Sequence, residues 1–186
     1  MNIQPDSDFV SVEEYFAGEQ QTEIKHEYIN GVIHAMGGAS IAHNLISLNI
    51  STALREYARV RSCQVLMADV KVYLNINGEN IYYYPDVLVS CDPDDKEKYY
   101  RSSPCLVVEV LSPATERIDR REKFHAYTSL DSLREYILVA QGRRLVTVFR
   151  RKNEWQPEIF TAEASMTLDC LDCTLSVEQI YEDVEV

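Results

Sequence analysis

The sequence has no long apolar run and no hydrophobic leader, and both absences limit where the protein can act. None of its apolar stretches approaches the roughly 20 residues that a transmembrane helix needs. The first residues, Met1 to Asp8, are polar and acidic, unlike the apolar segment of a secretory signal. The sequence therefore predicts a cytoplasmic protein with no membrane partner.

Several common catalytic signatures are also missing. The 6 glycines form neither a phosphate-binding loop nor a dinucleotide-binding fingerprint. Ser112 lacks the flanking glycines of a nucleophile elbow, and Cys105 has no histidine close to it in the chain. The sequence thus argues against a nucleotide-binding loop and against a serine or cysteine nucleophile.

The cysteines do not form the even, regularly spaced set of a disulfide framework. The chain has 5 of them, at Cys63, Cys91, Cys105, Cys170 and Cys173. Cys170 and Cys173 have a spacing found in metal and redox motifs, but a structural zinc site needs four ligands and no second pair lies at a matching distance. We therefore expect Cys170 and Cys173 to be reduced thiols near the end of a strand.

Basic residues are scarce, with 18 Lys and Arg against 30 Asp and Glu and a net charge of -12. Proteins that bind nucleic acids neutralise phosphates with Lys and Arg, so this balance predicts weak non-specific affinity for DNA. The basic residues are nevertheless clustered, in the segments 117–123 and 143–152. Each cluster is either a solvated face or a track for phosphates, and the sequence leaves both interpretations open.

The chain shows no internal repeat, low-complexity tract or linker, and its 186 residues suit one domain with one core. We expect a single domain over residues 1–186, with its core at about 10–180. Capping boxes begin short helices at Ser11 and Ser176, and Asn30-Gly31 indicates a β-hairpin. The periodicity predicts helices at 40–59 and 114–127, and strands at 63–74, 82–90, 104–111, 136–139, 145–149 and 155–160. This order predicts an α+β fold with a mixed central β-sheet flanked by helices.

Two of these strands are almost continuously apolar, and each is interrupted by one carboxylate. Asp86 lies near the start of the first strand, and Glu109 lies inside the second. Buried carboxylates are costly unless they are paired or bound to a cation, and two on adjacent strands repel each other. A divalent cation between them removes both penalties, and Mg²⁺ is the natural candidate. The structural alternatives are an edge-strand acid for Asp86 and an ion-paired acid for Glu109.

A charged helical segment follows the second strand, and it contains Lys123. Asp119 lies four residues before Lys123, so the two side chains share a face of the helix. Asp119 is expected to cap the helix, and Lys123 on its own would be an exposed lysine paired with Asp119. A helix that follows a strand bearing a carboxylate can also direct a lysine back toward the metal.

An ordered set of motifs resembles the Uma-type family of putative restriction endonucleases, which belongs to the PD-(D/E)XK nuclease superfamily. The set is Pro85-Asp86, Glu109-Val110-Leu111-Ser112-Pro113, Asp119, Lys123, Tyr127 and Arg134-Glu135-Tyr136, together with Glu27-Tyr28-Ile29-Asn30-Gly31 and His43. The resemblance covers roughly residues 10 to 180. It implies a restriction-endonuclease-like core, in agreement with the α+β prediction.

The resemblance also implies a function: a Mg²⁺-dependent endodeoxyribonuclease, with Mn²⁺ as the alternative ion, that acts on DNA as a homodimer. The expected catalytic residues are Asp86, Glu109, Lys123, Glu27 and His43. The expected metal ligands are Asp86, Glu109 and the carbonyl oxygen of Val110. Two assignments keep structural alternatives, because Glu27 could form a cross-strand ion pair with Lys25 or an arginine, and His43 could be a structural histidine. Asp69 also matches a family position, whereas Tyr127 and Tyr136 are expected to be core aromatics.

The sequence departs from the superfamily pattern at three positions. Leu111 occupies the usual lysine position, two residues after the glutamate, so the resemblance transfers that role to Lys123. The aromatic residue and aspartate that commonly end the family pattern are replaced by Ile137 and Ala140. Leu111 at the usual lysine position and the acidic composition keep a second hypothesis open: a catalytically inactive nuclease-fold module that binds DNA or regulates another protein.

Overall fold

The computed structural model describes residues 9–186, so the polar segment Met1 to Asp8 lies outside the described residues. The helices are α1 (Val12–Glu19), α2 (Ile41–Val60), α3 (Glu116–Ile118), α4 (Phe124–Thr128) and α5 (Val177–Ile180). The strands are β1 (His26–Ile29), β2 (Val32–Ala35), β3 (Gln64–Met67), β4 (Lys71–Ile76), β5 (Glu79–Tyr83), β6 (Val87–Ser90), β7 (Tyr100–Arg101), β8 (Pro104–Leu111), β9 (Glu135–Ala140), β10 (Leu145–Arg150), β11 (Pro157–Thr161), β12 (Ser165–Leu168) and β13 (Cys173–Ser176). No helix within residues 9–186 is both long and apolar enough to cross a bilayer.

The larger sheet has six strands in the order β11-β10-β9-β8-β6-β3. Strands β8 and β9 are parallel, and the other neighbouring pairs are antiparallel, which makes the sheet mixed. Every residue of β8 is buried, as expected for an apolar strand in the middle of a covered sheet. The predicted α+β architecture with a mixed sheet and flanking helices is confirmed.

A second sheet has the order β2-β1-β5-β4-β7, and a small third sheet pairs β12 with β13. The β1–β2 hairpin turns at Asn30-Gly31, where both residues have positive φ values of 44° and 94°. That conformation is the one a two-residue hairpin needs, so this turn was readable from the sequence. Both capping boxes, at Ser11 and Ser176, are also present.

Two predictions of single strands were wrong. The segment 63–74 divides into β3 and β4, and the segment 82–90 divides into β5 and β6, with the two halves of each in different sheets. Pro85 lies at the second break, where it lacks the N–H that a continuous ladder would require. At the first break, Asp69 lies in an exposed turn and pairs with Lys25 at 2.8 Å. The second break matters for the candidate site, because it places Asp86 directly before β6, next to the end of the β6–β8 ladder.

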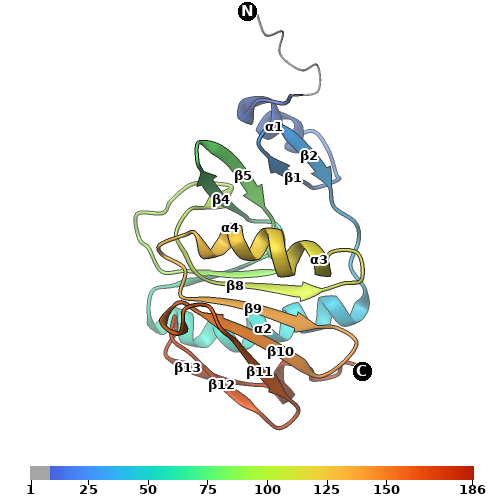
Figure 1. Cartoon of the computed structure of the whole chain (residues 1–186), viewed down its shortest axis with the longest axis vertical. Helices are drawn as coiled ribbons and strands as arrows, with labels where there is room; N and C mark the ends of the chain where they lie inside the picture. Colours follow the sequence, from blue (N-terminus) through green and yellow to red (C-terminus); the bar gives the residue numbers. More distant parts are fainter. Residues whose placement is uncertain (1–8) are drawn as a thin grey trace, which may run out of the picture.

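The two faces of the six-stranded sheet are covered by different elements, and Figure 1 shows α2 and α4 on opposite sides of it. Alternate residues of β8 (Leu106, Val108 and Val110) pack in a core with α2 and α5. The intervening residues Val107 and Leu111 pack in a second core with α4, β4 and β5. Because β-strand side chains alternate, Glu109 faces this second core.

The helical segment after β8 is not one regular α-helix. A π-helical turn, Asp119–Lys123, separates α3 from α4. Such turns insert an extra residue into the helix and are frequent at functional sites. Here both ends of the turn are buried. The prediction of an exposed Lys123 is therefore excluded, and the side chain lies inside the protein.

The prediction that Cys170 and Cys173 are both reduced thiols was wrong for Cys170, which forms a disulfide, and is confirmed for Cys173. Cys63 is bonded to Cys91, and Cys105 is bonded to Cys170, across sequence separations of 28 and 65 residues. Cys173 is buried and has no disulfide partner among residues 9–186. The pairing depends on strands that meet only in the folded sheet, so local spacing could not reveal it.

Candidate active site

Asp86 lies just before β6, at the point where the β6–β8 ladder ends. The last pair of that ladder is Val87 with Val108. Beyond it, Asp86 Oδ2 accepts a hydrogen bond of 2.6 Å from the backbone N–H of Val110. The side chain thus replaces the next ladder bond, and this hydrogen bond fixes Asp86 against β8.

His43 approaches the same carboxylate from the first turn of α2. Ser40 caps this helix by accepting a hydrogen bond from the backbone N–H of His43. His43 Nε2 lies 3.3 Å from Asp86 Oδ2. Burial lowers the pKa of His43, but the hydrogen bond and charge of Asp86, and the backbone of Val110, outweigh burial and raise it. The imidazolium form is therefore favoured where Asp86 and Val110 meet.

Glu109 is buried inside β8, on the face opposite α2. Its Oε1 accepts hydrogen bonds from Lys123 Nζ and from the hydroxyl of Tyr127, each at 3.2 Å. Burial raises the pKa of Glu109 well above its usual range, although the charge of Lys123 opposes the shift. Glu109 thus holds a proton more strongly than an exposed glutamate would.

Lys123 is the centre of this group of acids. Its Nζ lies 2.9 Å from Glu27 Oε1, 3.2 Å from Glu109 Oε1 and 3.6 Å from Asp119 Oδ1. Burial lowers the pKa of Lys123, but the charges of these carboxylates raise it by more than burial lowers it. The net effect is a raised pKa, so the side chain stays protonated. Three carboxylates thus face one ammonium, which leaves an excess of two negative charges when all of them are ionised.

Asp119 is not the N-cap of a helix, contrary to the sequence prediction; it is the C-terminal cap residue of α3. Thr115 holds the N-cap position of α3, and Asp119 is only 2% exposed. Its Oδ1 has no hydrogen-bond partner within residues 9–186. Burial raises its pKa, with Lys123 opposing. The π-helical turn explains the burial, because it directs both Asp119 and Lys123 toward β8.

Glu27 comes from β1, in the second sheet, and reaches the site across the boundary between the two sheets. Its Oε1 accepts a hydrogen bond from the backbone N–H of Tyr84 at 3.2 Å and pairs with Lys123. The alternative pairing with Lys25 is excluded, because Lys25 binds Asp69 instead. The hairpin therefore contributes one oxygen to the cluster around Lys123.

Two buried tyrosines, expected only to fill the core, also have polar roles. Tyr127 donates to Glu109, and the hydroxyl of Tyr136 donates to the backbone carbonyl of Asp119 at 2.9 Å. Both rings remain fully buried in the core, as predicted. The local sequence around a buried tyrosine does not show whether its hydroxyl donates a hydrogen bond to a distant residue. These two contacts therefore could not be predicted from the sequence.

Exposed arginines surround this end of the sheet. Leu111 and Ala140, the last residues of β8 and β9, are paired, so the segments that follow both strands leave from the same edge. Exposed basic side chains on these segments include Arg117, Arg121, Arg143 and Arg144. Arg117 is paired with Glu122. The basic cluster at 143–152 is not uniform, because Arg150 is buried and binds Glu135 and Glu158.

The sequence model of the Uma2 family, described as "Putative restriction endonuclease", matches residues 12–178. This match covers most of the chain, and the protein belongs to that family. The family resemblance inferred from the motifs is thereby confirmed.

Two relatives come from Synechocystis sp. and are both described as uncharacterized proteins. One is 37% identical over 175 residues, which cover 92% of this chain and 91% of the relative. The other is 32% identical over 131 residues, which cover 69% of this chain and 73% of the relative. Neither description adds an activity.

The fold is also similar to a crystal structure from Anabaena variabilis, described as a putative nuclease belonging to DUF820. The TM-score is 0.71 at 16% sequence identity, and the match covers 92% of this chain and 97% of the other. At this identity the similarity establishes the fold alone. Together with the family match, it makes this chain a nuclease-fold protein of the Uma2 family.

Proposed function

We propose that the protein is a divalent-metal-dependent endonuclease that hydrolyses phosphodiester bonds in DNA. The observation that carries the proposal is the buried cluster of Glu27, Glu109 and Asp119 around Lys123, beside Asp86. Acids are rarely buried together unless something holds them, and clusters with raised pKa values mark functional sites. The single ammonium of Lys123 cannot balance three ionised carboxylates, so the cluster can accommodate further positive charge.

The donor set suits a hard cation such as Mg²⁺, with Mn²⁺ as the alternative. Mg²⁺ prefers carboxylate, carbonyl and water oxygens. Asp86, Glu109 and the carbonyl of Val110 are the proposed ligands, and Oδ1 of Asp119, which lies 3.6 Å from Lys123 Nζ, is a further oxygen of the cluster. When bound, such an ion acidifies a water molecule and stabilises the charge that develops on the scissile phosphate.

Lys123 acts as a cation in this proposal, not as a base. Its raised pKa keeps the ammonium charged, so it can offset negative charge on the phosphate and position the attacking water. The usual lysine of the superfamily lies on the strand, where this chain has Leu111 with its side chain in the core. Lys123 reaches Glu109 from the following helix instead.

His43 and Glu27 are proposed to assist. His43 shares Asp86 and the backbone of Val110 with the proposed ion, so the imidazolium and the ion compete for the same oxygens. A neutral His43 could orient a phosphate or accept a proton near the helix N-terminus. Glu27 holds Lys123 in position through its 2.9 Å contact.

The arginines at the edge of the sheet would bind the DNA backbone. Arg121 and Arg143 are exposed and lie on the segments that follow β8 and β9, and cationic side chains of this kind bind phosphates. The net charge of -12 keeps the expected non-specific affinity low. Cutting both strands requires two sites, which supports a homodimer as the proposed assembly, and the cytoplasm remains the proposed location.

The decisive experiment compares Asp86→Ala with the matched control Asp69→Ala in a plasmid-cleavage assay with Mg²⁺ or Mn²⁺. Asp86→Ala should lower the cleavage rate by on the order of 10³, because it removes a proposed ion ligand. Asp69→Ala alters only an exposed turn and should cleave at the normal rate. Equal rates for Asp86→Ala and the unchanged protein would refute the proposed role of Asp86.

The second candidate function is a nuclease-fold module that binds DNA or regulates a partner without catalysis. One observation favours it: Lys123 already pairs with three carboxylates of the site. Calorimetric titration with Mg²⁺ and Mn²⁺, in the absence and presence of DNA, separates the two functions. No heat of metal binding under either condition, with DNA affinity retained, would select the binding module.

A further inference from the structure

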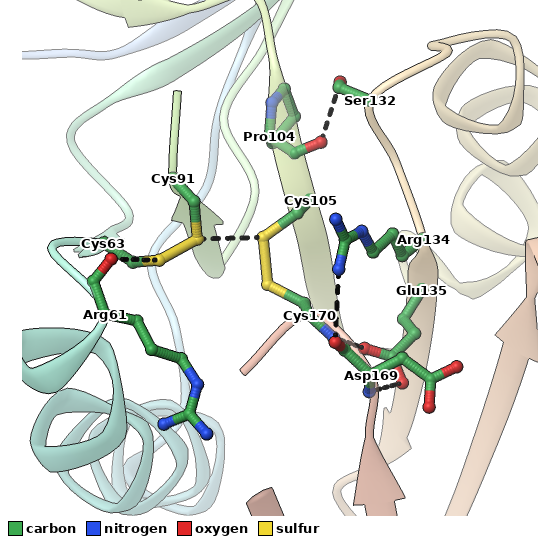
Figure 2. The surroundings of a disulfide bond; sticks show 10 residues. All are labelled: Arg61, Cys63, Cys91, Pro104, Cys105, Ser132, Arg134, Glu135, Asp169 and Cys170. Carbon is green, nitrogen blue, oxygen red and sulfur yellow. Dashed lines mark hydrogen bonds between the residues drawn. A yellow bond between two sulfur atoms is a disulfide. The ribbon is translucent and has the colours of Figure 1, made fainter. Parts of the chain in front are cut away.

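Four of the five cysteines meet at the opposite end of β8 from the acids. Cys105 is the second residue of β8, and Cys91 directly follows β6. Cys63 directly precedes β3, and Cys170 lies in the turn between β12 and β13. Figure 2 shows the two disulfides side by side, with Cys91 Sγ 3.6 Å from Cys105 Sγ. The four side chains therefore form one sulfur cluster, brought together from four distant segments.

Three of the sulfur atoms are gathered closely enough for one ion to reach them: a disulfide joins Cys105 to Cys170, and the 3.6 Å from Cys91 Sγ to Cys105 Sγ is the spacing of separate ligands. The Sγ atoms of Cys91, Cys105 and Cys170 all lie within 4.8 Å of one another. Four thiolates around Zn²⁺ at about 2.3 Å each lie roughly 3.8 Å apart in a tetrahedron. Cys63, whose sulfur is bonded to Cys91 Sγ, is the available fourth ligand. The cluster thus has the number and type of donors that a structural zinc ion takes.

The backbone at the cluster is fixed by hydrogen bonds that do not depend on the disulfides. The N–H of Cys63 donates to Ala58 at 2.9 Å, and the carbonyl of Cys105 accepts from the N–H of Arg134 at 2.8 Å. The N–H of Cys170 donates to the carboxylate of Glu135 at 3.1 Å. Because these contacts involve backbone atoms and no sulfur, we expect them to hold Cys63, Cys105 and Cys170 in place when the disulfides are reduced.

The surroundings also fit a charged thiolate cluster. Cys105 and Cys170 are buried and pack in the core between the six-stranded sheet and α2. Four thiolates and one Zn²⁺ carry a net negative charge, and Arg134 lies beside the Cys105–Cys170 pair in Figure 2, where it donates to the carbonyl of Asp169. A cation next to the cluster lowers the cost of burying that charge.

We propose that these four cysteines, when reduced, bind one Zn²⁺ as a structural Cys₄ site. A dithiol reductant gives two electrons and two protons to each disulfide and leaves as its own disulfide. The four resulting thiols release their protons as the thiolates bind the ion. Thiolates prefer Zn²⁺ to Mg²⁺, so this site is independent of the proposed nuclease centre. In a reducing compartment, where disulfides are rare, the zinc form would prevail.

The test is an anaerobic titration of the reduced full-length protein with Co²⁺, a spectroscopic substitute for Zn²⁺. One equivalent of Co²⁺ should produce the strong thiolate-to-metal charge-transfer absorption of a tetrahedral site, and Zn²⁺ should then displace it. Reduced protein that gives no such absorption would overturn the proposal. Direct exchange between the two neighbouring disulfides would then be the remaining role of the cluster.

Variants locate the site. Cys105→Ser should weaken Co²⁺ binding by at least about a hundredfold and lose the charge-transfer absorption. The matched control Cys173→Ser removes the buried cysteine outside the cluster and should leave both unchanged. Cys63→Ser, at a half-buried position, provides a second loss variant if Cys105→Ser fails to fold. Full binding by folded Cys105→Ser or Cys63→Ser would refute the assignment, and Asp86→Ala should keep the absorption.

Discussion

The two ends of β8 carry opposite kinds of chemistry within one strand. Cys105, near its start, belongs to a cluster of sulfur atoms, whereas Glu109, four residues later, belongs to a cluster of oxygen atoms. At about 3.3 Å per residue, the two positions lie on the order of 13 Å apart. The strand is buried throughout, so each cluster must balance its own charge inside the protein.

The two clusters solve that problem in different ways. At the sulfur end, covalent pairing makes the cysteines neutral, so no counterion is needed in the oxidised form. At the oxygen end, Lys123 neutralises only part of the charge, and burial raises the pKa values of Glu109 and Asp119. At the oxygen end the positive charge comes from Lys123, whereas the oxidised sulfur end needs no counterion.

Lys123→Met should have the largest effect on this comparison. It leaves Glu109, Glu27 and Asp119 without their ammonium, and breaking a buried ion pair by removing one partner costs about 3–5 kcal/mol. Urea denaturation would measure the change in the free energy of unfolding. Lys96→Met, which removes an exposed lysine paired at 3.8 Å, is the control and should be almost neutral. A similar, small loss for both variants would mean that Lys123 does not support the oxygen cluster.

Mg²⁺ should stabilise the oxygen end selectively. An ion present at about 100 times its dissociation constant raises the free energy of unfolding by about 2.7 kcal/mol. Thermal denaturation should show this gain in the unchanged protein and in Cys173→Ser, but not in Asp86→Ala. If Asp86→Ala gains as much stability as the unchanged protein, the ion binds elsewhere and the comparison between the two ends fails.

Removing charge from both partners should be milder than removing the lysine alone. Adding Glu109→Gln to Lys123→Met replaces a buried carboxylate by a neutral amide, so we expect it to restore roughly 1–2 kcal/mol of the lost stability. A double-mutant cycle measured by urea denaturation gives this coupling. Additive losses would mean that Glu109 and Lys123 do not stabilise each other, and would contradict the expected coupling.

The smallest predicted effect concerns one hydroxyl. Tyr127→Phe removes a hydrogen bond to Glu109 but keeps the ring in the core, so it should cost about 1 kcal/mol. The control is Tyr57→Phe, on the exposed side of α2, where no change is expected. Chemical denaturation of both variants checks this. A loss for Tyr127→Phe no greater than that of its control would remove Tyr127 from the group that positions Glu109.

Much of the fold and part of the site followed from local sequence. The hairpin at Asn30-Gly31, the two capped helices and the buried β8 each have a signal within a few residues of the chain. Asp86 and Glu109 were recognisable because a lone carboxylate in an apolar strand is costly. The division of 63–74 between two sheets was not recognisable, because β-periodicity does not say which sheet a strand joins.

The sequence by itself determined the family and the class of fold, and it singled out Asp86 and Glu109, because these depend on short-range patterns and spacings. Only the tertiary structure decided that Asp119 and Lys123 are buried beside Glu109. The spacing of apolar residues predicts a helix but does not reveal that one of its turns is π-helical. The tertiary structure alone also brought Cys63, Cys91, Cys105 and Cys170 together. The physical reason is the same in both cases: contacts between residues far apart in the chain are set by how sheets and helices pack.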